Sequence, residues 1–312
     1  MLSFVSKHSS LLLMLAAVLG FLIPNASKAL FPYLPLILFF LMLFTLLGIK
    51  QNVLIKKLAE RQVWGYAIFH AIGLSLISCS VAALLGVNSA LLVAISAVTA
   101  TGSLFATPAI ARSIGLDALE AMAMTIATTL LMPAVLYFNL MIFQDEAFSL
   151  DMKSYFVRLV IFIAGPMLIS AFCHHLVPKE TLHRIHGKLS QFTILLVFSF
   201  PFGLVGEFRD MFDLSLWLGM QYLLIGITLC ALFFIAGYIC YHRQGVDKAL
   251  VAAITAANRN VLLTFTVASS YLGPEYLAIM GAIQFPTFCL PLFVKYISPR
   301  LHKRASRLQI NQ

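Results

Sequence analysis

The sequence predicts an all-α membrane protein with ten transmembrane helices. Hydrophobic residues make up 61% of the chain and charged residues 11%, whereas soluble domains carry about 25% charged residues. The mean hydropathy is +0.95. Apolar runs of about 20 residues, enough for a helix to cross roughly 30 Å of hydrocarbon, recur along the whole chain. These observations exclude a soluble domain and make the lipid bilayer a partner of the protein.

The apolar runs can be placed to within a few residues. The ten predicted spans are residues 9–24, 30–49, 64–86, 89–110, 118–142, 154–177, 189–207, 214–241, 248–271 and 276–297. The first run follows Lys7 and resembles a signal peptide. No clean small-x-small cleavage site follows it, and the next apolar run begins almost at once. We therefore expect the first run to be retained as a span.

The basic residues lie mostly on one side of this arrangement. With both termini in the cytoplasm, the opposite side holds only Lys28, Lys153, Arg158 and Arg209. Every other Lys and Arg, apart from Arg259 inside a span, is cytoplasmic. This asymmetry follows the positive-inside rule and predicts a multi-pass protein of an inner or plasma membrane. The net charge of +9 is then a topology signal, and no nucleic-acid partner is expected.

The chain is predicted to contain two inverted five-helix repeats, residues 1–145 and 146–312, within one membrane domain. The fourth span of the first half has a polar interruption at Thr99–Pro108, and that of the second half has one at Thr255–Phe265. The fifth spans also correspond, at Thr128–Pro133 and Gln284–Pro291. An odd number of spans in each half inverts one repeat relative to the other.

The fourth span is predicted to break inside the membrane. Gly102 weakens a helix through its backbone entropy, and Pro108 through its missing N–H. Such a break is tolerated only beside protein or a water-filled cavity. The hydroxyl-bearing residues of this cluster, which we expect to line a cavity, are Thr99, Thr101, Ser103 and Thr107. The alternative is that each hydroxyl bonds a helix carbonyl and packs as a small residue.

The ninth span contains Arg259, and a cation at bilayer depth costs about 2.5–3.5 kcal/mol on insertion scales. No Gly or Pro lies near its centre, so backbone chemistry does not predict an unwound segment there. On a helix, Thr255, Asn258 and Arg259 share one face. Three partners are open to Arg259: Glu120, carbonyls of a broken helix, or an anionic substrate. The last predicts binding of an organic anion.

Catalysis and metal binding are not expected. The five cysteines lie in apolar spans without metal-ligand spacing, and no cofactor is predicted. Asp117 and Glu120 are interfacial, and His70 is expected to bond a neighbouring helix, so no acid–base pair lies at bilayer depth. An intramembrane enzyme is therefore disfavoured. A receptor is disfavoured too, because the short termini leave no room for an appended domain.

Two segments carry a resemblance to a known family. Residues 252–265, Ala-Ala-Ile-Thr-Ala-Ala-Asn-Arg-Asn-Val-Leu-Leu-Thr-Phe, resemble the penultimate helix of the bile acid:sodium symporter family. Residues 97–133 resemble its fourth and fifth helices. That family lies within a broader superfamily of bile acid, arsenite and riboflavin transporters. The resemblance implies a core domain from helices three to five and eight to ten, a panel domain from the rest, and discontinuous helices four and nine that cross.

The resemblance also implies a site. Arg259 and Asn260 match a Gln/Arg-Asn pair, Thr128 and Thr129 match hydroxyls of the fifth helix, and Thr107 matches one of the fourth. Two departures weaken sodium binding: Thr255 stands where the family has an acid, and Pro108 where it often has Asn. Hard cations are usually held by several oxygens that include a carboxylate. The coupling ion is left open between Na⁺, a proton and none.

Together these features predict a secondary active transporter of a small or amphipathic organic anion, working by alternating access. Arg259 would pair with the anion. The residues expected to complete the substrate site are Asn258, Asn260, Gln284, Thr99, Thr101 and Ser103. The residues expected to line an ion site are Thr107, Thr125, Thr128, Thr129 and Thr255. Substrate identity, transport direction and oligomeric state stay open, with a monomer among the alternatives.

Overall fold

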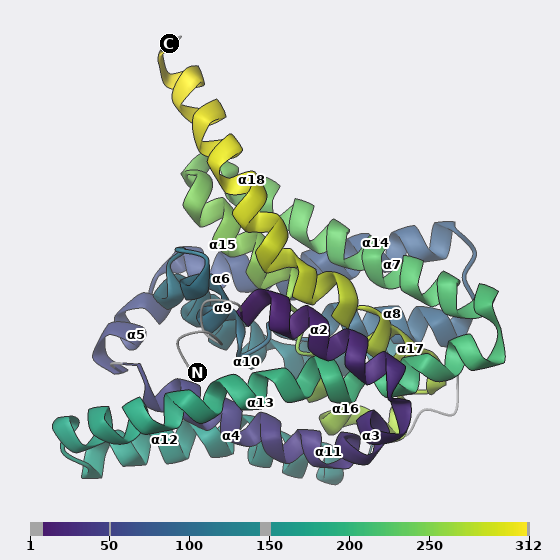
Figure 1. The fold of residues 1–312 in the computed structure, drawn as a ribbon, viewed down its shortest axis with the longest axis horizontal. Coiled ribbons are helices and arrows are strands. Elements are labelled where there is room, and N and C mark those ends of the chain that lie inside the picture. The colour runs from purple at the N-terminus through teal and green to yellow at the C-terminus, as the bar shows by residue number, and fades with distance from the viewer. Residues whose placement is uncertain (1–8, 50, 144–150, 311–312) are drawn as a thin grey trace.

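A computed structural model describes residues 9–49, 51–143 and 151–310, and almost all of them are helical (Figure 1). The first half contains α2 (Ser9–Leu22), α3 (Pro24–Leu30), α4 (Leu34–Leu47), α5 (Gln51–Leu58), α6 (Arg61–Ile68), α7 (Leu74–Leu84), α8 (Ser89–Ala100), α9 (Thr107–Ser113) and α10 (Ala118–Phe143). The second half contains α11 (Met152–Leu159), α12 (Gly165–Leu176), α13 (Lys179–Leu214), α14 (Leu216–Tyr241), α15 (Val246–Ala257), α16 (Val261–Ala268), α17 (Pro274–Ala282) and α18 (Gln284–Ile310). The predicted repeat boundary at 145/146 lies outside the described residues.

Six helical segments are long and apolar enough to cross a membrane. They are Pro24–Leu47, Arg61–Leu84, Ala118–Phe143, Lys153–Leu176, Leu216–Gln244 and Pro274–Lys303. They coincide with predicted spans 2, 3, 5, 6, 8 and 10. The other predicted spans fall on α2, on α13 and on the helix pairs α8–α9 and α15–α16. The chain is thus a helical protein suited to a membrane, as its composition predicts.

The predicted loop between the sixth and seventh spans is wrong, because helix α13 begins at Lys179 and runs through that region. Pro178 precedes the helix in an extended conformation. The following residues, Lys-Glu-Thr-Leu-His-Arg-Ile-His, contain no proline or glycine to interrupt it. The charged residues of this region predicted where the apolar span begins, at residue 189, but the helix itself already begins at Lys179.

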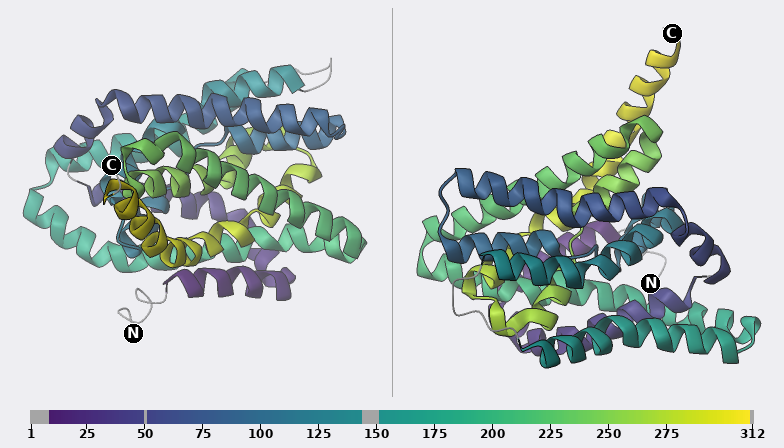
Figure 2. Two further views of the ribbon diagram at one scale, coloured as in Figure 1. Left: turned by 90° about the horizontal axis from the view of Figure 1, so that it is seen from above. Right: turned by 180° about the vertical axis from the view of Figure 1, so that it is seen from behind.

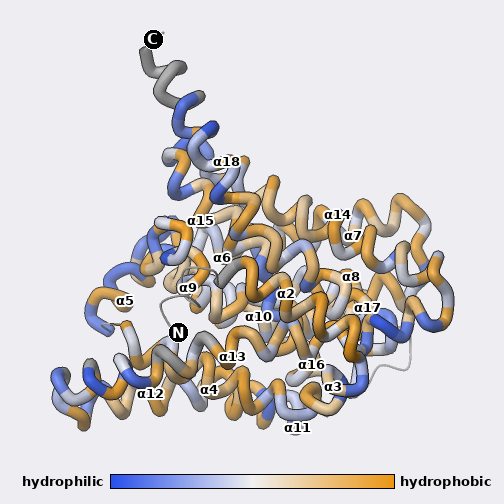
Figure 3. The backbone as a smooth tube through the Cα atoms, viewed as in Figure 1, coloured by the Kyte–Doolittle hydropathy of each residue, from blue (hydrophilic) through white to orange (hydrophobic). Residues whose placement is uncertain are grey.

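The helices pack in two groups. Helix α13 packs along α2, α3 and α4, and α12 packs along α4; α13 also packs against α14 and α17 of the other group. Helices α3, α4, α11 and α12 lie along the lower edge of Figure 1. Helix α10 packs against α6, α8 and α9, and α14 packs along α15 and α17. The end of α18 extends beyond both groups (Figure 2). Hydrophobic residues predominate along the bundle, whereas α5 mixes hydrophilic and hydrophobic residues and the coloured part of α18 beyond the bundle is largely hydrophilic (Figure 3).

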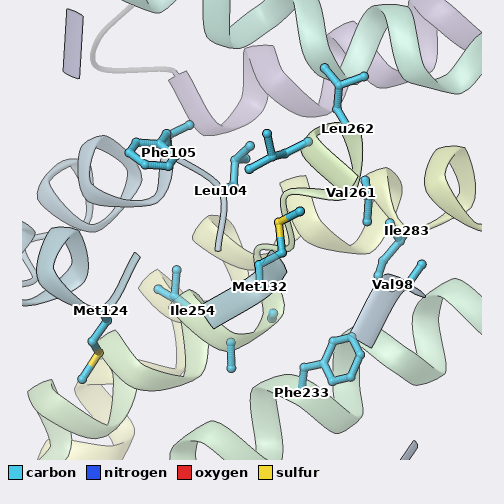
Figure 4. Packing of buried hydrophobic residues seen from close by; sticks show 14 of the residues in the cluster. Val98, Leu104, Phe105, Met124, Met132, Phe233, Ile254, Val261, Leu262 and Ile283 are labelled. Carbon is cyan, nitrogen blue, oxygen red and sulfur yellow. The ribbon is translucent and has the colours of Figure 1, made fainter. Parts of the chain in front are cut away.

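Buried apolar side chains surround the middle of the second group. Figure 4 shows Leu104, Val261, Met132 and Phe233 gathered there from four parts of the chain. Each of these side chains is at most 5% exposed. The segments between α8 and α9 and between α15 and α16 cross within this core.

Candidate functional site

The predicted interruption of the fourth span is present. Helix α8 ends at Ala100, Thr101 is extended with φ −65° and ψ 144°, and α9 begins only at Thr107. Pro108 occupies the first turn of α9, where its missing N–H is not needed. A Cβ added at Gly102 would lie 2.8 Å from the Thr129 Cα. Gly102 therefore lets the broken segment lie directly against α10.

The ninth span is also interrupted, as the family resemblance implies, although its backbone chemistry did not predict a break. Thr255, Asn258 and Arg259 therefore do not share the face of one continuous helix. Helix α15 ends at Ala257 and α16 begins at Val261. The side chain of Asn260 accepts a hydrogen bond from the Leu263 N–H at 3.3 Å and so caps α16. Asn is a favoured N-cap residue, and this was the signal in the sequence for a new helix start.

The two interruptions are bonded to each other. The Leu104 N–H donates to the Asn258 carbonyl at 2.8 Å, and the Asn260 N–H donates to the Gly102 carbonyl at 2.9 Å. Ser103 and Arg259 face each other across this antiparallel bridge. The backbone groups freed by unwinding are thus satisfied by the partner segment, as burial in an apolar core requires. Long-range pairing of this kind has no local sequence signature.

Replacing Asn260 by alanine is expected to lower the free energy of unfolding by about 1 kcal/mol, because α16 loses its cap. Under the transport function predicted from the sequence, uptake should fall as well, because the variant removes the Asn260 Nδ2, a buried donor at the crossing with no partner among the described residues. The matched control is Asn88→Ala, since Asn88 caps α8 at an exposed site by accepting from the Leu91 N–H at 2.8 Å. Its uptake should stay at the wild-type level. Equal uptake by the two purified variants would contradict a role for Asn260 in the site.

Arg259 is 3% exposed and lies against the end of α8. Its NH1 donates to the carbonyls of Thr99 at 3.0 Å and Thr101 at 2.9 Å. Its Cζ lies 4.1 Å from the ring centroid of Phe233, a cation–π contact. Of the three partners open to Arg259, the structure contains the carbonyls. Glu120 is instead paired with Lys57.

His70 completes the environment of Arg259, and the sequence did not indicate that these two residues would meet. The His70 Nε2 lies 2.7 Å from the Arg259 NH1 and 3.2 Å from the Thr101 carbonyl. Because a guanidinium can only donate, the shorter contact makes Nε2 the acceptor. Nδ1 must then carry the proton, and it lies 3.3 Å from the Tyr66 hydroxyl, which in turn donates to the Ala252 carbonyl. His70 lies in a π-helical turn, Phe69–Gly73, a form often found at functional sites. His70 therefore bonds neighbouring helices, as predicted.

The predicted hydroxyl and amide residues have divided roles. Ser103 lies on the crossing: its N–H donates to the Thr128 Oγ1 at 3.1 Å, and its Oγ lies 3.3 Å from the Thr107 Oγ1. The side chains that donate to a carbonyl of their own helix are Thr99, Thr128, Thr129 and Thr255. The Gln284 side chain, at the start of α18, donates to the Met280 carbonyl of α17. For the side chains of Thr255 and Gln284, no hydrogen bond to the crossing is found among the described residues.

Several buried polar atoms at the crossing have no hydrogen-bond partner within the described residues. They are both amide atoms of Asn258, the Nδ2 of Asn260, the Nε and NH2 of Arg259 and the Oγ1 of Thr125. Buried polar groups are rarely left unpaired, because each costs about 1–3 kcal/mol. Their concentration at one point of an apolar core marks this crossing as a candidate binding site.

A pocket of about 440 Å³ lies between the two groups of helices. From one group it is lined by α4 and α13 residues such as Thr45 and Val197, and from the other by Ala106, Pro108 and Arg112 of the interrupted span. Most of its walls are apolar. Arg112 is an exposed cation that sequence analysis treated only as a topology marker. The pocket therefore places a positive charge beside the break of the fourth span.

Among the described residues, no group of three His, Cys, Asp or Glu side chains is arranged to hold a metal ion. Comparison of the chain with protein-family models and with curated proteins gives no match. The resemblance to bile acid:sodium symporters therefore stays a prediction.

Proposed function

We propose that this protein is a secondary active transporter of a small or amphipathic organic anion and works by alternating access. The observation that carries the proposal is the bridge between two interrupted helices in the core, beside a pocket. Transporters build substrate sites from such discontinuous helices, because irregular backbone at membrane depth is tolerated only around a site or within protein. The unpaired polar atoms at the crossing add to this support.

The proposed architecture has ten spans in two inverted repeats, with both termini in the cytoplasm of an inner or plasma membrane. Helices α6–α10 and α14–α18 would form the core domain, and α2–α4 and α11–α13 the panel domain. The pocket lies between α4 and α13 on one side and α9 and α10 on the other, and the interrupted pairs α8–α9 and α15–α16 would be the corresponding helices of the two repeats. Movement of one group against the other would then open the pocket to alternate sides.

The pocket favours an anion with an apolar body. Its volume of about 440 Å³ lies within the usual range for small-molecule sites. Apolar walls with a single guanidinium, that of Arg112, suit a carboxylate or sulfonate attached to a hydrocarbon frame. The Nε and NH2 of Arg259, which lack a partner, would offer a second polar point deeper in the core.

Thermal-shift screening of the purified protein tests this proposal. Short carboxylates, sulfonates and bile salts would each be added with and without sodium. An amphipathic anion should raise the Tm, and the same anion should then be taken up by proteoliposomes that contain the protein. The absence of any shift across all three classes of anion would overturn the proposal.

Arg112→Gln is expected to weaken binding of the anion about tenfold, because one charge-assisted hydrogen bond is worth roughly 1.5–3 kcal/mol and the site is partly solvated. Stability should change little, since Arg112 is exposed. Arg243→Gln serves as the matched control, because Arg243 is an exposed arginine that does not line the pocket. Isothermal titration of both variants with the anion found by screening would measure the effect, and equal affinities would contradict it.

A further inference from the structure

We infer that Arg259 is a built-in cation that takes the place of a coupling ion, so that Na⁺ does not bind at the crossing. The inference deepens the proposed function, and the part of it that is tested by uptake rests on that function. The part that is tested by cation binding rests only on the contacts of Arg259. The first observation is where the guanidinium lies: NH1 is within 3.0 Å of the carbonyl oxygens of Thr99 and Thr101.

These carbonyls belong to the C-terminal end of a half-helix. Helix α8 ends at Ala100, so the carbonyls of its last turn have no partner within the helix. A helix C-terminus carries a partial negative charge, which favours a cation. Helix α15 ends beside the same point, and the Arg259 N–H donates to the Ala257 carbonyl at 3.0 Å. The Arg259 side chain therefore bonds one half-helix end and an unwound carbonyl, and its backbone N–H bonds the end of the second half-helix.

In secondary transporters, unwound carbonyls and half-helix C-termini are the groups that coordinate a coupling Na⁺ or proton. Here a fixed positive charge already occupies them. Arginine keeps this charge at neutral pH, and its planar guanidinium suits several acceptors at once. The lone pair of the His70 Nε2 is also used, since it accepts from NH1 at 2.7 Å. The guanidinium thus balances the partial negative charge at the helix ends without an added ion.

A second cation at this point would be repelled. No carboxylate within the described part of the chain contacts Arg259, and the one buried acid of the neighbouring helix, Glu120, is paired with Lys57 at 2.5 Å. Thr255, two residues before the end of α15, donates its hydroxyl proton to the Val251 carbonyl. Two like charges a few ångströms apart in an apolar core repel strongly without a compensating acid. The site therefore holds one cation, and that cation is covalently attached.

Removal of the guanidinium should convert the cluster into a site for a free cation. We would measure the Tm of the purified full chain in choline chloride, NaCl and millimolar guanidinium chloride, for wild type and Arg259→Ala. Wild type should show the same Tm in NaCl as in choline chloride. Arg259→Ala should lose several degrees and regain most of the loss with guanidinium. Asn260→Ala, which disturbs the same crossing without removing a cation, should show no such rescue.

The outcomes separate clearly. Specific stabilisation of wild type by Na⁺, or an Arg259→Ala variant that no cation restores, would overturn the inference. If Arg259→Ala cannot be purified, the wild-type comparison still decides, together with Arg259→Lys, which keeps a cation and should remain insensitive to Na⁺. Anion uptake that requires a Na⁺ gradient would refute the inference and leave the proposed function standing. Rescue by guanidinium without binding of any anion would refute the proposed function instead.

Discussion

Gly102→Ala is expected to abolish uptake and to lower the Tm of the purified protein. The added Cβ would lie 2.8 Å from the Cα and 2.9 Å from the N of Thr129, closer than such contacts normally come. Both of these atoms belong to the backbone of α10, so no side-chain rotation relieves the clash. Overpacking of this kind typically costs about 1–3 kcal/mol.

The effect on uptake should exceed the effect on stability. The Gly102 carbonyl accepts the Asn260 N–H at 2.9 Å, so a displaced residue 102 pulls on the bridge between the interrupted spans. Gly65→Ala is the matched control, because a Cβ at Gly65 meets nothing within 4 Å and the residue lies in an exposed part of α6. It should keep full uptake. Full uptake by Gly102→Ala would show that the close approach to α10 is not needed for function.

Local chemistry and long-range pairing account for what could and could not be predicted from the sequence. Gly102 and Pro108 act on their own backbone, so the break in the fourth span was predictable. The break at Asn258–Asn260 depends on hydrogen bonds to Gly102 and Leu104, more than 150 positions away in the chain. Nothing near Arg259 encodes it except the cap at Asn260. Periodicity alone therefore favoured a continuous helix.

The partners of Arg259 show the same limit. An interior cation could be recognised from composition, and its need for partners followed from desolvation. Which partner it has depends on how α6 packs against the crossing, because that packing brings His70 to 2.7 Å from NH1. Phe233 reaches the other side of the guanidinium from α14. Both contacts come from helices whose sequences contain no sign of an arginine nearby.

An ion pair between α5 and α10 stabilises the connection between the two groups of helices. Helix α5 joins α4 of one group to α6 of the other. Its Lys57 Nζ lies 2.5 Å from the Glu120 Oε2 and 2.8 Å from the Glu60 Oε2. Glu120 lies in the first turn of α10, where a helix N-terminus favours a negative charge. Its side chain is only 3% exposed, so it depends on Lys57 for its counter-charge.

Lys57→Ala is expected to destabilise the protein by about 3 kcal/mol or more, because it leaves a buried carboxylate without its partner. Burial lowers the pKa of Lys57, but hydrogen bonds to Glu120 and Glu60 outweigh burial and raise it above the ordinary value of 10.5. Because the lysine pKa is higher in the folded than in the unfolded state, protonated Lys57 stabilises the folded state below pH 10.5. This stabilisation is lost only as the pH rises through the pKa of the folded state. The Tm difference between wild type and variant should therefore be constant at neutral and mildly alkaline pH.

Lys56→Ala, at an exposed neighbouring position, should leave the Tm unchanged. The double variant Lys57→Ala/Glu120→Gln should recover much of the lost stability, since it removes the buried charge. If the double variant is as unstable as Lys57→Ala alone, then packing by the lysine stem, rather than its charge, holds α5 to α10.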